Sequence, residues 1–438
     1  MEPLFSAVIC GCHAALFREA LHEVYIARIQ RGDASYAAEV LGARGALLSV
    51  LIHFFKHASW ESPVEMGVEE QSLTADDQII IFTQAALYLS ALRGHASMEA
   101  RICYERVESL CNSLNRPQLL YVALTGQWRY YYKTNNPSVA LQIAERVHSM
   151  AQEQDDPALM IGAYNHLAGT LLYLGDIGTA HKHVMRSVQI WRSGSVQSHA
   201  VEGELESRAV VCLGLAAICE WHLGKIASCQ ALIDEAISLA KELNDMSALA
   251  LALQWATNLA YYERNPADVE RLASDSIELS TRYSFPHWVT HGTILRGWAR
   301  SALGDTAEGI AWIEDGIRDF RVAGAIQELP FLLALKAEAL HLGGRTSEAL
   351  EAIREAEALV ERSEERWWGA ELHRLHGVLL TAIGADETQI EASFCQAIKL
   401  AREQKAISLE KRAEETYAEY RRQKVSASEG RGFRLPLW

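Results

Sequence analysis

Residues 155–188 read DDPALMIGAYNHLAGTLLYLGDIGTAHKHVMRSV and carry every signal of a helical hairpin. The acidic pair before Pro157 supplies an N-terminal cap, and the proline suits the first turn of a helix. Apolar residues then recur at helical spacing as far as Leu171, and Gly175-Asp176 ends the helix. The inner face of a second helix follows as Ala180, Val184 and Val188. This stretch predicts two antiparallel helices joined by a short turn.

The same turn recurs along the chain every 40 residues, with one step of 49. The turn positions are His95, Asn135, Gly175, Gly224, Arg264, Gly304, Gly344 and Gly384. Five residues after each of the first seven turns stand Ala100, Ala140, Ala180, Cys229, Val269, Gly309 and Ala349; twelve after stand Val107, Val147, Ser187, Ala236, Ser276, Gly316 and Ala356. Such mostly small residues let helices pack closely. Because strand signals are scarce, the period predicts an all-α solenoid of stacked helix pairs.

The repeat register divides the chain into four parts. We predict N-terminal helices, or a degenerate repeat, in residues 1–75 and about eight repeats of about 40 residues in 76–402. A capping helix is expected in 403–424, with its amphipathic part near 408–422, and a flexible tail in 425–438. Within the first part, helices are expected at about 12–30 and 36–57, with a loop at about 62–74. The extra residues of the 49-residue step fall at 193–206 and predict a surface loop.

Composition argues against several classes of partner. The net charge of −15 opposes binding to nucleic acid or to an anionic membrane, because such binding depends on Lys and Arg. No apolar run approaches the roughly 18–20 residues of a membrane helix, and residues 1–12 lack the basic start of a signal peptide. The eight cysteines are dispersed, which is typical of reduced, buried thiols. We therefore expect a cytoplasmic protein that contacts neither membrane nor nucleic acid directly.

Within each unit the pattern resembles the tetratricopeptide repeat. Its large and small positions are matched in the third repeat by Leu167-Ala168, Leu171, Gly175-Asp176, Ala180, Val184 and Ser187. The period of 40 is longer than the usual repeat of this family. The resemblance implies a right-handed superhelix whose first helices line a concave face.

Two stretches extend this resemblance to a more specific group. ILRGWA at 294–299 and ERWWGAELHRL at 365–375 look like the C-terminal, MalT-like repeat region of large bacterial signal-transduction ATPases. Those proteins join a nucleotide cyclase or a winged-helix module to a P-loop ATPase and then to such repeats. The resemblance covers about 75–400 and implies a sensor or interaction arm with an ATPase, cyclase or regulator as partner. Gly-x4-Gly-Lys-Ser/Thr is absent, so the chain resembles the arm alone, stand-alone or as a fragment.

In this register a set of polar and aromatic residues faces the inner curve of the solenoid. The set comprises Arg129, Tyr132, Asn165, Trp221, His222, Gln254, Asn258, Tyr261, Trp298, Glu338, His341 and Arg374. Rings combined with amide and charged groups suit the binding of peptides or sugars. The alternative is that part of the set packs between adjacent helices. We expect a non-catalytic scaffold or sensor that binds a protein segment or small effector; the alternative is the effector-sensing arm of a transcriptional regulator or cyclase.

Other residue patterns were weighed as metal or catalytic sites. Cys10-Gly11-Cys12-His13 offers soft ligands but lacks a second pair, and His53/His57 and His373/His376 lack the His-Glu-x-x-His context. No Gly-x-Ser-x-Gly elbow occurs. The sequence therefore nominates no catalytic residue, metal or cofactor.

A basic line is the last candidate. Arg296, Lys336 and His376 occupy equivalent positions in successive repeats, with Arg300 one turn on. They would suit an anionic ligand. The alternative is a solvated face paired with Glu314, Asp315, Glu351 or Glu355.

Overall fold

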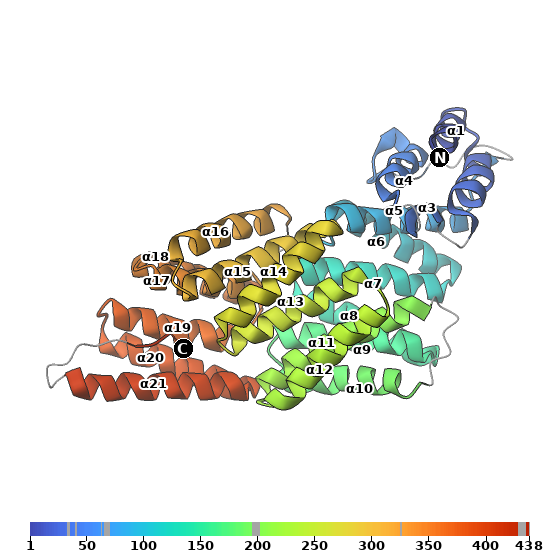
Figure 1. Ribbon diagram of the computed structural model, residues 1–438. Coiled ribbons are helices and arrows are strands. Elements are labelled where there is room, and N and C mark those ends of the chain that lie inside the picture. The colour runs from blue at the N-terminus through green and yellow to red at the C-terminus, as the bar shows by residue number, and fades with distance from the viewer. Residues whose placement is uncertain are drawn as a thin grey trace. The chain divides into compact units, whose positions relative to one another are not determined.

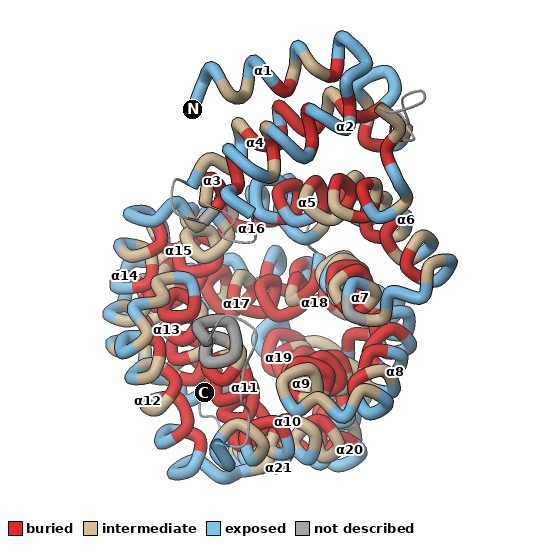
Figure 2. The backbone as a smooth tube through the Cα atoms, turned by 90° about the vertical axis from the view of Figure 1, so that its right-hand side faces the viewer, coloured by how far each residue is buried: buried red, intermediate tan, exposed pale blue. Residues whose placement is uncertain are grey.

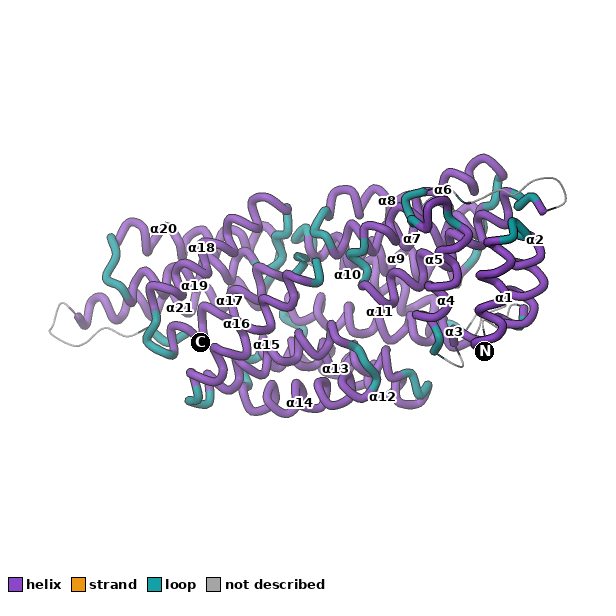
Figure 3. The backbone as a smooth tube through the Cα atoms, turned by 90° about the horizontal axis from the view of Figure 1, so that it is seen from above, coloured by secondary structure: helices purple, strands orange, loops and turns teal. Residues whose placement is uncertain are grey.

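The computed structural model describes residues 1–32, 36–39, 42–62, 64, 71–194, 202–324, 326–427 and 435–437. Within these ranges the regular structure is helical, and pairing between extended residues is confined to one isolated bridge, Phe55 to Val64. Figure 3 shows this plainly, because no strand is drawn. The all-α prediction is confirmed. None of the described helices combines the length and apolar character that a bilayer crossing requires.

The chain divides into two compact units, residues 1–134 and 135–438, called unit 1 and unit 2. The elements of unit 1 are α1 (Glu2–His13), α2 (Phe17–Glu19), the π-helix η1 (Ala20–Gln30), α3 (Tyr36–Glu39), α4 (Arg44–Leu51), the 3₁₀ turns η3 (Ile52–Phe54) and η4 (Lys56–Ala58), α5 (Ala75–Arg93), α6 (Met98–Leu114) and α7 (Pro117–Lys133). The start of α5 is fixed by a capping box, in which Thr74 and Asp77 satisfy each other's backbone N–H groups.

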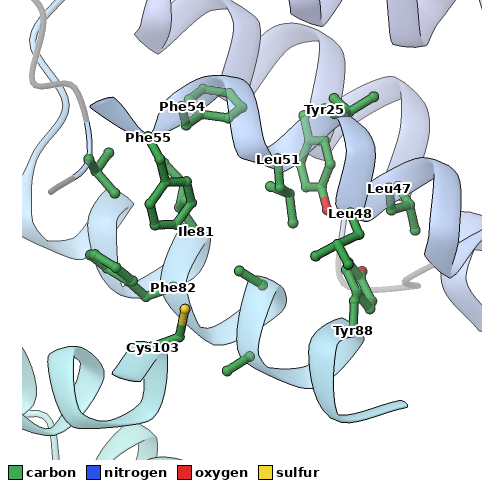
Figure 4. Packing of buried hydrophobic residues seen from close by; sticks show 14 of the residues in the cluster. Tyr25, Leu47, Leu48, Leu51, Phe54, Phe55, Ile81, Phe82, Tyr88 and Cys103 are labelled. Atoms are coloured by element: carbon green, nitrogen blue, oxygen red, sulfur yellow. The ribbon is translucent and has the colours of Figure 1, made fainter. Parts of the chain in front are cut away.

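The core of unit 1 joins the N-terminal helices to α5 and α6 (Figure 4). The Phe55 ring meets the rings of Trp60 and Phe82 edge to face, at centroid distances of 5.0 and 5.1 Å. Elsewhere in this core the buried amide of Gln30 donates to the hydroxyl of Tyr88 over 2.7 Å. Residues 1–64 therefore share one core with the first regular hairpin.

The helices expected at 12–30 and 36–57 are interrupted in the structure. A turn after His13 separates α1 from the π-helix, and α4 ends at Leu51 in 3₁₀ turns. His57 has a left-handed backbone with φ of 57°. His53 and His57, which fall inside the helix expected at 36–57, therefore do not share one helical face, because no continuous helix joins them.

Unit 2 consists of α8 (Pro137–Glu153), α9 (Pro157–Tyr173), α10 (Ile177–Arg192), α11 (Glu202–His222), α12 (Ile226–Glu242), α13 (Met246–Tyr262), α14 (Pro266–Arg282), α15 (Pro286–Ala302), α16 (Thr306–Val322), α17 (Leu329–Leu342), α18 (Thr346–Ser363), α19 (Gly369–Ala382), α20 (Glu387–Gln404) and α21 (Ile407–Ala427). Neighbouring helices pack as antiparallel pairs, α9 on α10 through α19 on α20, and the pairs stack as a right-handed tetratricopeptide-like solenoid (Figure 1). Pro157, for which the sequence predicts a first-turn position, starts α9, and Pro286 and Pro330 stand likewise in the first turns of α15 and α17.

The turn residues that recur every 40 positions share a backbone conformation. Seven of the eight expected turn residues adopt positive φ, and in the first repeat Gly94 rather than His95 does so. A second column of positive φ closes the other end of the hairpins: Asn115, Asp155, Asn244, Ser284, Gly324, Glu364. Left-handed backbone reverses the chain after a helix with little steric cost for Gly and a modest cost for Asn.

Gly384 isolates this backbone effect. Its φ is 68°, and a Cβ built on it meets no atom within 4 Å. Gly384→Ala is expected to lower the free energy of unfolding by about 1–2 kcal/mol, because only left-handed strain is added. Gly384→Asn is expected to lose less, since asparagine tolerates this region. Urea unfolding of the two variants checks the prediction, and equal losses would contradict it.

The small-residue columns lie where hairpins pack most closely. All of the residues five and twelve positions after the turns are buried. A Cβ added at Gly309 would stand 2.3 Å from the carbonyl oxygen of Gly297, and one at Gly377 would stand 2.8 Å from the ring of Phe394. Glycine is required at these positions because α15 and α16, and α19 and α20, approach closely there.

The predicted connections have mixed outcomes. Within the expected loop at 193–206, residues 202–206 are helical and belong to α11, while 195–201 lie outside the described residues. Within 62–74, residues 63 and 65–70 also lie outside them. At this end of the chain α20 runs to Gln404 and α21 covers Ile407–Ala427, where the sequence placed a capping helix at 403–424. Of the expected tail, 435–437 are described and Leu437 is 6% exposed.

Candidate functional site

The inner faces of the unit 2 helices are filled by the protein's own side chains. Eight of the predicted inner-face residues are buried: Trp221, His222, Gln254, Asn258, Tyr261, Trp298, Glu338 and Arg374. Figure 2 shows buried residues along the inner helices α17 and α19. In this state these eight side chains lie in the interior rather than on an open surface. Asn165 and His341 of unit 2 are half-buried, and in unit 1 Arg129 is exposed and Tyr132 half-buried.

A charged network occupies part of this interior. Glu338 of α17 accepts hydrogen bonds from the Tyr261 hydroxyl, the Trp298 indole and the guanidinium of Arg264, at 2.8, 2.8 and 2.7 Å. Glu371 of α19 is also paired with Arg264. Arg264 therefore bridges the two carboxylates from the turn after α13.

Glu371 gathers two further arginines. Arg374 approaches it at 2.8 Å from the same helix, and Arg412 of α21 approaches at 3.3 Å. The three arginines are 15% exposed or less, and both carboxylates are at most 1% exposed. Burial acts to raise the pKa of Glu371, but the charges of the arginines outweigh it and hold that pKa well below its usual range. Burial lowers the pKa of Arg412 to about 10. Three cations and two anions leave one net positive charge in the interior.

Next to this network lies an aromatic cluster. It consists of Tyr173, Trp221, Tyr261, Tyr262, Phe331, Trp367 and Trp368, with His222 among them. The ring of His222 is fully buried, 5.1 Å from Trp221 and 5.9 Å from Trp367. Neither of its nitrogens has a hydrogen-bond partner in the described part of the chain. Burial, and to a lesser extent the charge of Arg412, lower the pKa of His222 to about 3.

Contacts distant in sequence seal this interior. The backbone N–H of Arg366 donates to the carbonyl oxygen of Tyr173 over 2.7 Å. The Ser408 hydroxyl donates to the carbonyl oxygen of Trp221 over 2.5 Å, and Arg412 donates to that of Tyr262. The C-terminal part of unit 2 therefore bonds to backbone carbonyl groups at the ends of α9, α11 and α13.

Glu365 stands at the same junction. It accepts hydrogen bonds from the amide of Asn135 at 2.8 Å and the indole of Trp367 at 2.9 Å. Burial raises its pKa to about 8, and the charge of Glu328 acts in the same direction. Glu365 therefore joins the segment before α19 to the turn before α8.

The metal candidates do not assemble a site. Burial raises the pKa of Cys12 to about 12, which keeps the thiol protonated, and Cys10 is exposed. His373 and His376 both contact one carboxylate oxygen of Glu357, at 3.2 and 2.9 Å. Burial acts to raise the pKa of Glu357, but the hydrogen bonds from the two histidines outweigh this effect and lower the pKa to about 2. Among the described residues, no group of three or more His, Cys, Asp or Glu is arranged to hold a metal ion.

The basic line consists of ion pairs. Lys336 pairs with Glu314 at 3.1 Å, as the solvated-face alternative expected. Arg296 pairs with Glu270, and Arg300 with Glu308. Each of these cations has an acidic partner on an adjacent helix. The basic residues therefore form ion pairs between neighbouring helices rather than a site for an anionic ligand.

Sequence reasoning missed residues that are central to the interior. Arg264 was recognised as a turn position and Glu371 as part of a motif, but neither was assigned to the inner face. A signal existed for Arg264: an arginine stands where most repeats have glycine, and its φ is 59°. Arg412 gave no signal, because its role depends on a contact with Tyr262, 150 residues away.

Comparisons with known proteins agree with this architecture. The family model for anaphase-promoting complex subunit 5 matches residues 201–262. An uncharacterized protein, R02095, of Rhizobium meliloti (strain 1021) is 23% identical over 296 residues, which are 67% of this chain and 28% of that protein. The chain thus spans less than a third of the length of this relative.

Two solved structures share the fold. A Rap protein complexed with competence and sporulation factor has 12% identity and a TM-score of 0.58, over 84% of this chain and 99% of that one. The Rap conjugation gene regulator of plasmid pLS20, in complex with the Phr* peptide, has 12% identity and a TM-score of 0.51, over 93% and 97%. At such identities the likeness establishes a tetratricopeptide-like repeat fold.

Proposed function

We propose that this chain is a non-catalytic binding and sensing module that recognises a segment of a partner protein and responds by a change in the winding of unit 2. The observation that carries the proposal is the seal of the interior by a few polar bonds. Bonds such as Arg366 to Tyr173 and Ser408 to Trp221 join distant helices at their ends. A ligand that binds a more loosely or a more tightly wound form of unit 2 with higher affinity shifts the population toward that form.

The nature of the ligand follows from fold and charge. Stacked hairpins present long edges that suit extended segments. Both solved proteins of similar fold are complexes, one with competence and sporulation factor and one with a peptide, which supports a protein segment as ligand. The net charge of −15 argues against nucleic acid. The predicted inner-face residues, from Arg129 to Arg374, remain candidates for contact with the ligand in a more loosely wound form of the solenoid.

A second role is favoured by the lengths of the proteins. The matched part of the R02095 protein is 28% of its length, so a segment similar to this chain is there part of a much larger protein. This supports the alternative that the present chain acts as the sensing arm of a bacterial signalling ATPase, cyclase or transcriptional regulator, whose activity it would control. A small effector is the alternative ligand in that role.

A selection experiment tests the main proposal. A library of random 12-residue peptides is selected against the full chain, and binders are re-measured by calorimetry. We expect binders with micromolar or tighter affinity that slow or speed hydrogen exchange at the ends of α9, α11 and α13. Binders whose affinity changes in Ser408→Ala but not in the control Ser393→Ala, a half-buried serine of α20, would support coupling to winding. No peptide binder, or binders that leave exchange in unit 2 unchanged, would overturn the proposal.

A further inference from the structure

One hollow in unit 2 lies at the helix ends rather than in the sealed interior. It has a volume of about 690 Å³, in the range of ligand pockets. One wall is formed by the ends of α17 and α19 with the turn between α17 and α18: His341, Leu342, Gly344, Thr346, Val378, Thr381 and Ala382. The opposite wall is the segment Leu435–Leu437. We call the helical wall the α17/α19 groove.

The segment Leu435–Leu437 faces this groove with alternating burial. Leu437 is buried, Leu435 is half-buried and Pro436 between them is exposed. Alternate side chains of an extended chain point in opposite directions, which fits this pattern. Proline has no N–H group, so its exposed position costs no hydrogen bond.

The groove has the chemistry of a peptide site. Leu342 and Val378 supply apolar contact, while His341 and Thr346 supply polar groups. The Nδ1 atom of His341 and the hydroxyl of Thr346 are 3.0 Å apart, which fixes the orientation of the ring. His341 is also one of the ligand contacts predicted from the sequence.

The apolar surface continues beyond the three residues that now cover it. Leu342 is 38% exposed, and Leu303 and Ile383, which stand one position nearer the turn in the hairpins on either side, are 56% and 47% exposed. Exposed leucine and isoleucine at equivalent turns form an apolar edge. A segment longer than Leu435–Leu437 would cover more of it and thus bind more tightly.

We propose that the α17/α19 groove binds an apolar, proline-containing segment of a partner protein, and that Leu435–Leu437 occupies it as an intramolecular competitor. This rests on the proposed function, since it names the site and the ligand class of the binding module. Because the competitor is tethered, it acts at a high effective concentration, and a partner segment must displace it. Release of Leu435–Leu437 is therefore the step that opens the site.

The test uses a fluorescent peptide, RGFRLPLW, which copies residues 431–438. Its binding is followed by anisotropy with the full wild-type chain and with full-length Leu437→Asp. We expect at least tenfold tighter binding to Leu437→Asp, because its own segment no longer occupies the groove. The peptide RGFRSPSW, without leucines, is expected not to bind.

Matched substitutions locate the site. In the Leu437→Asp background, Ala382→Glu places a charge in the groove and is expected to abolish binding. Ala302→Glu, at the equivalent position of α15, is expected to leave binding intact. Both are tested in the complete chain, and circular dichroism verifies their folding.

The outcomes separate the two proposals. Equal binding of RGFRLPLW to wild type and Leu437→Asp overturns the competitor, and binding unaffected by Ala382→Glu overturns the groove. Suppose that one of these two negative results is obtained while library peptides bind the full chain and change hydrogen exchange in unit 2. The proposed function then stands and this inference falls. If neither library peptides nor RGFRLPLW bind any form, both fall.

Discussion

Replacement of Glu371 by glutamine is expected to lower the free energy of unfolding of unit 2 by about 3–5 kcal/mol. Glu371 is paired with Arg264, Arg374 and Arg412, and all four side chains are buried or nearly so. Glutamine keeps the shape but not the charge, so three guanidinium groups would share the single carboxylate of Glu338. An unpaired buried charge costs several kcal/mol because the interior cannot replace its hydration.

Urea unfolding followed by tryptophan fluorescence measures this loss, since nine of the eleven tryptophans belong to unit 2. The matched control is Glu348→Gln, which breaks an exposed pair with Arg345 at 2.5 Å. Exposed pairs contribute about 0–1 kcal/mol, so the control is expected to change little. The double variant Glu371→Gln/Arg412→Gln should recover part of the loss, because one excess cation is removed. Equal, small effects in Glu371→Gln and the control would mean that water reaches the network.

The periodic part of this architecture could be predicted from sequence because it is local. A turn residue such as Gly304 and a packing residue such as Gly309 act within one hairpin, so each repeat shows the same requirement. The exception, Gly94 in place of His95, arises in the first repeat, where a one-residue shift leaves the small positions at Ala100 and Val107 buried.

Whether the inner-face residues are buried or exposed could not be predicted in the same way. Whether Trp221 faces a ligand or the protein interior depends on Ser408 and Arg412, which lie almost 190 residues further along the chain. The superhelical winding that brings them together is the sum of small rotations at every hairpin. A residue pattern can show that Trp221 and Tyr261 point inward, but an inward position in a tightly wound solenoid is a buried one.

His222 supplies the second large effect, which depends on pH. Its pKa is about 3 in the folded protein because of burial, against about 6.5 for an unfolded histidine. A base with a lowered folded pKa contributes stability that is fully present above pH 6.5 and is lost as the pH falls toward 3, because the unfolded chain takes up the proton first. At 1.36 kcal/mol per unit, the loss attributable to His222 between pH 7 and pH 4.5 is about 2–3 kcal/mol.

The variant His222→Phe isolates this contribution. Phenylalanine fits a site bounded by Trp221, Tyr262 and Trp367 and has no nitrogen without a partner, so stability at pH 8 is expected to be equal or higher. In urea titrations from pH 7 to 4.5, the wild type should lose about 2–3 kcal/mol more than this variant. His222→Gln separates charge from polarity: it should be less stable at every pH, with the same flattened pH dependence. Parallel curves for wild type and His222→Phe would show that protons reach the ring in the folded state and that the interior of unit 2 is open to water.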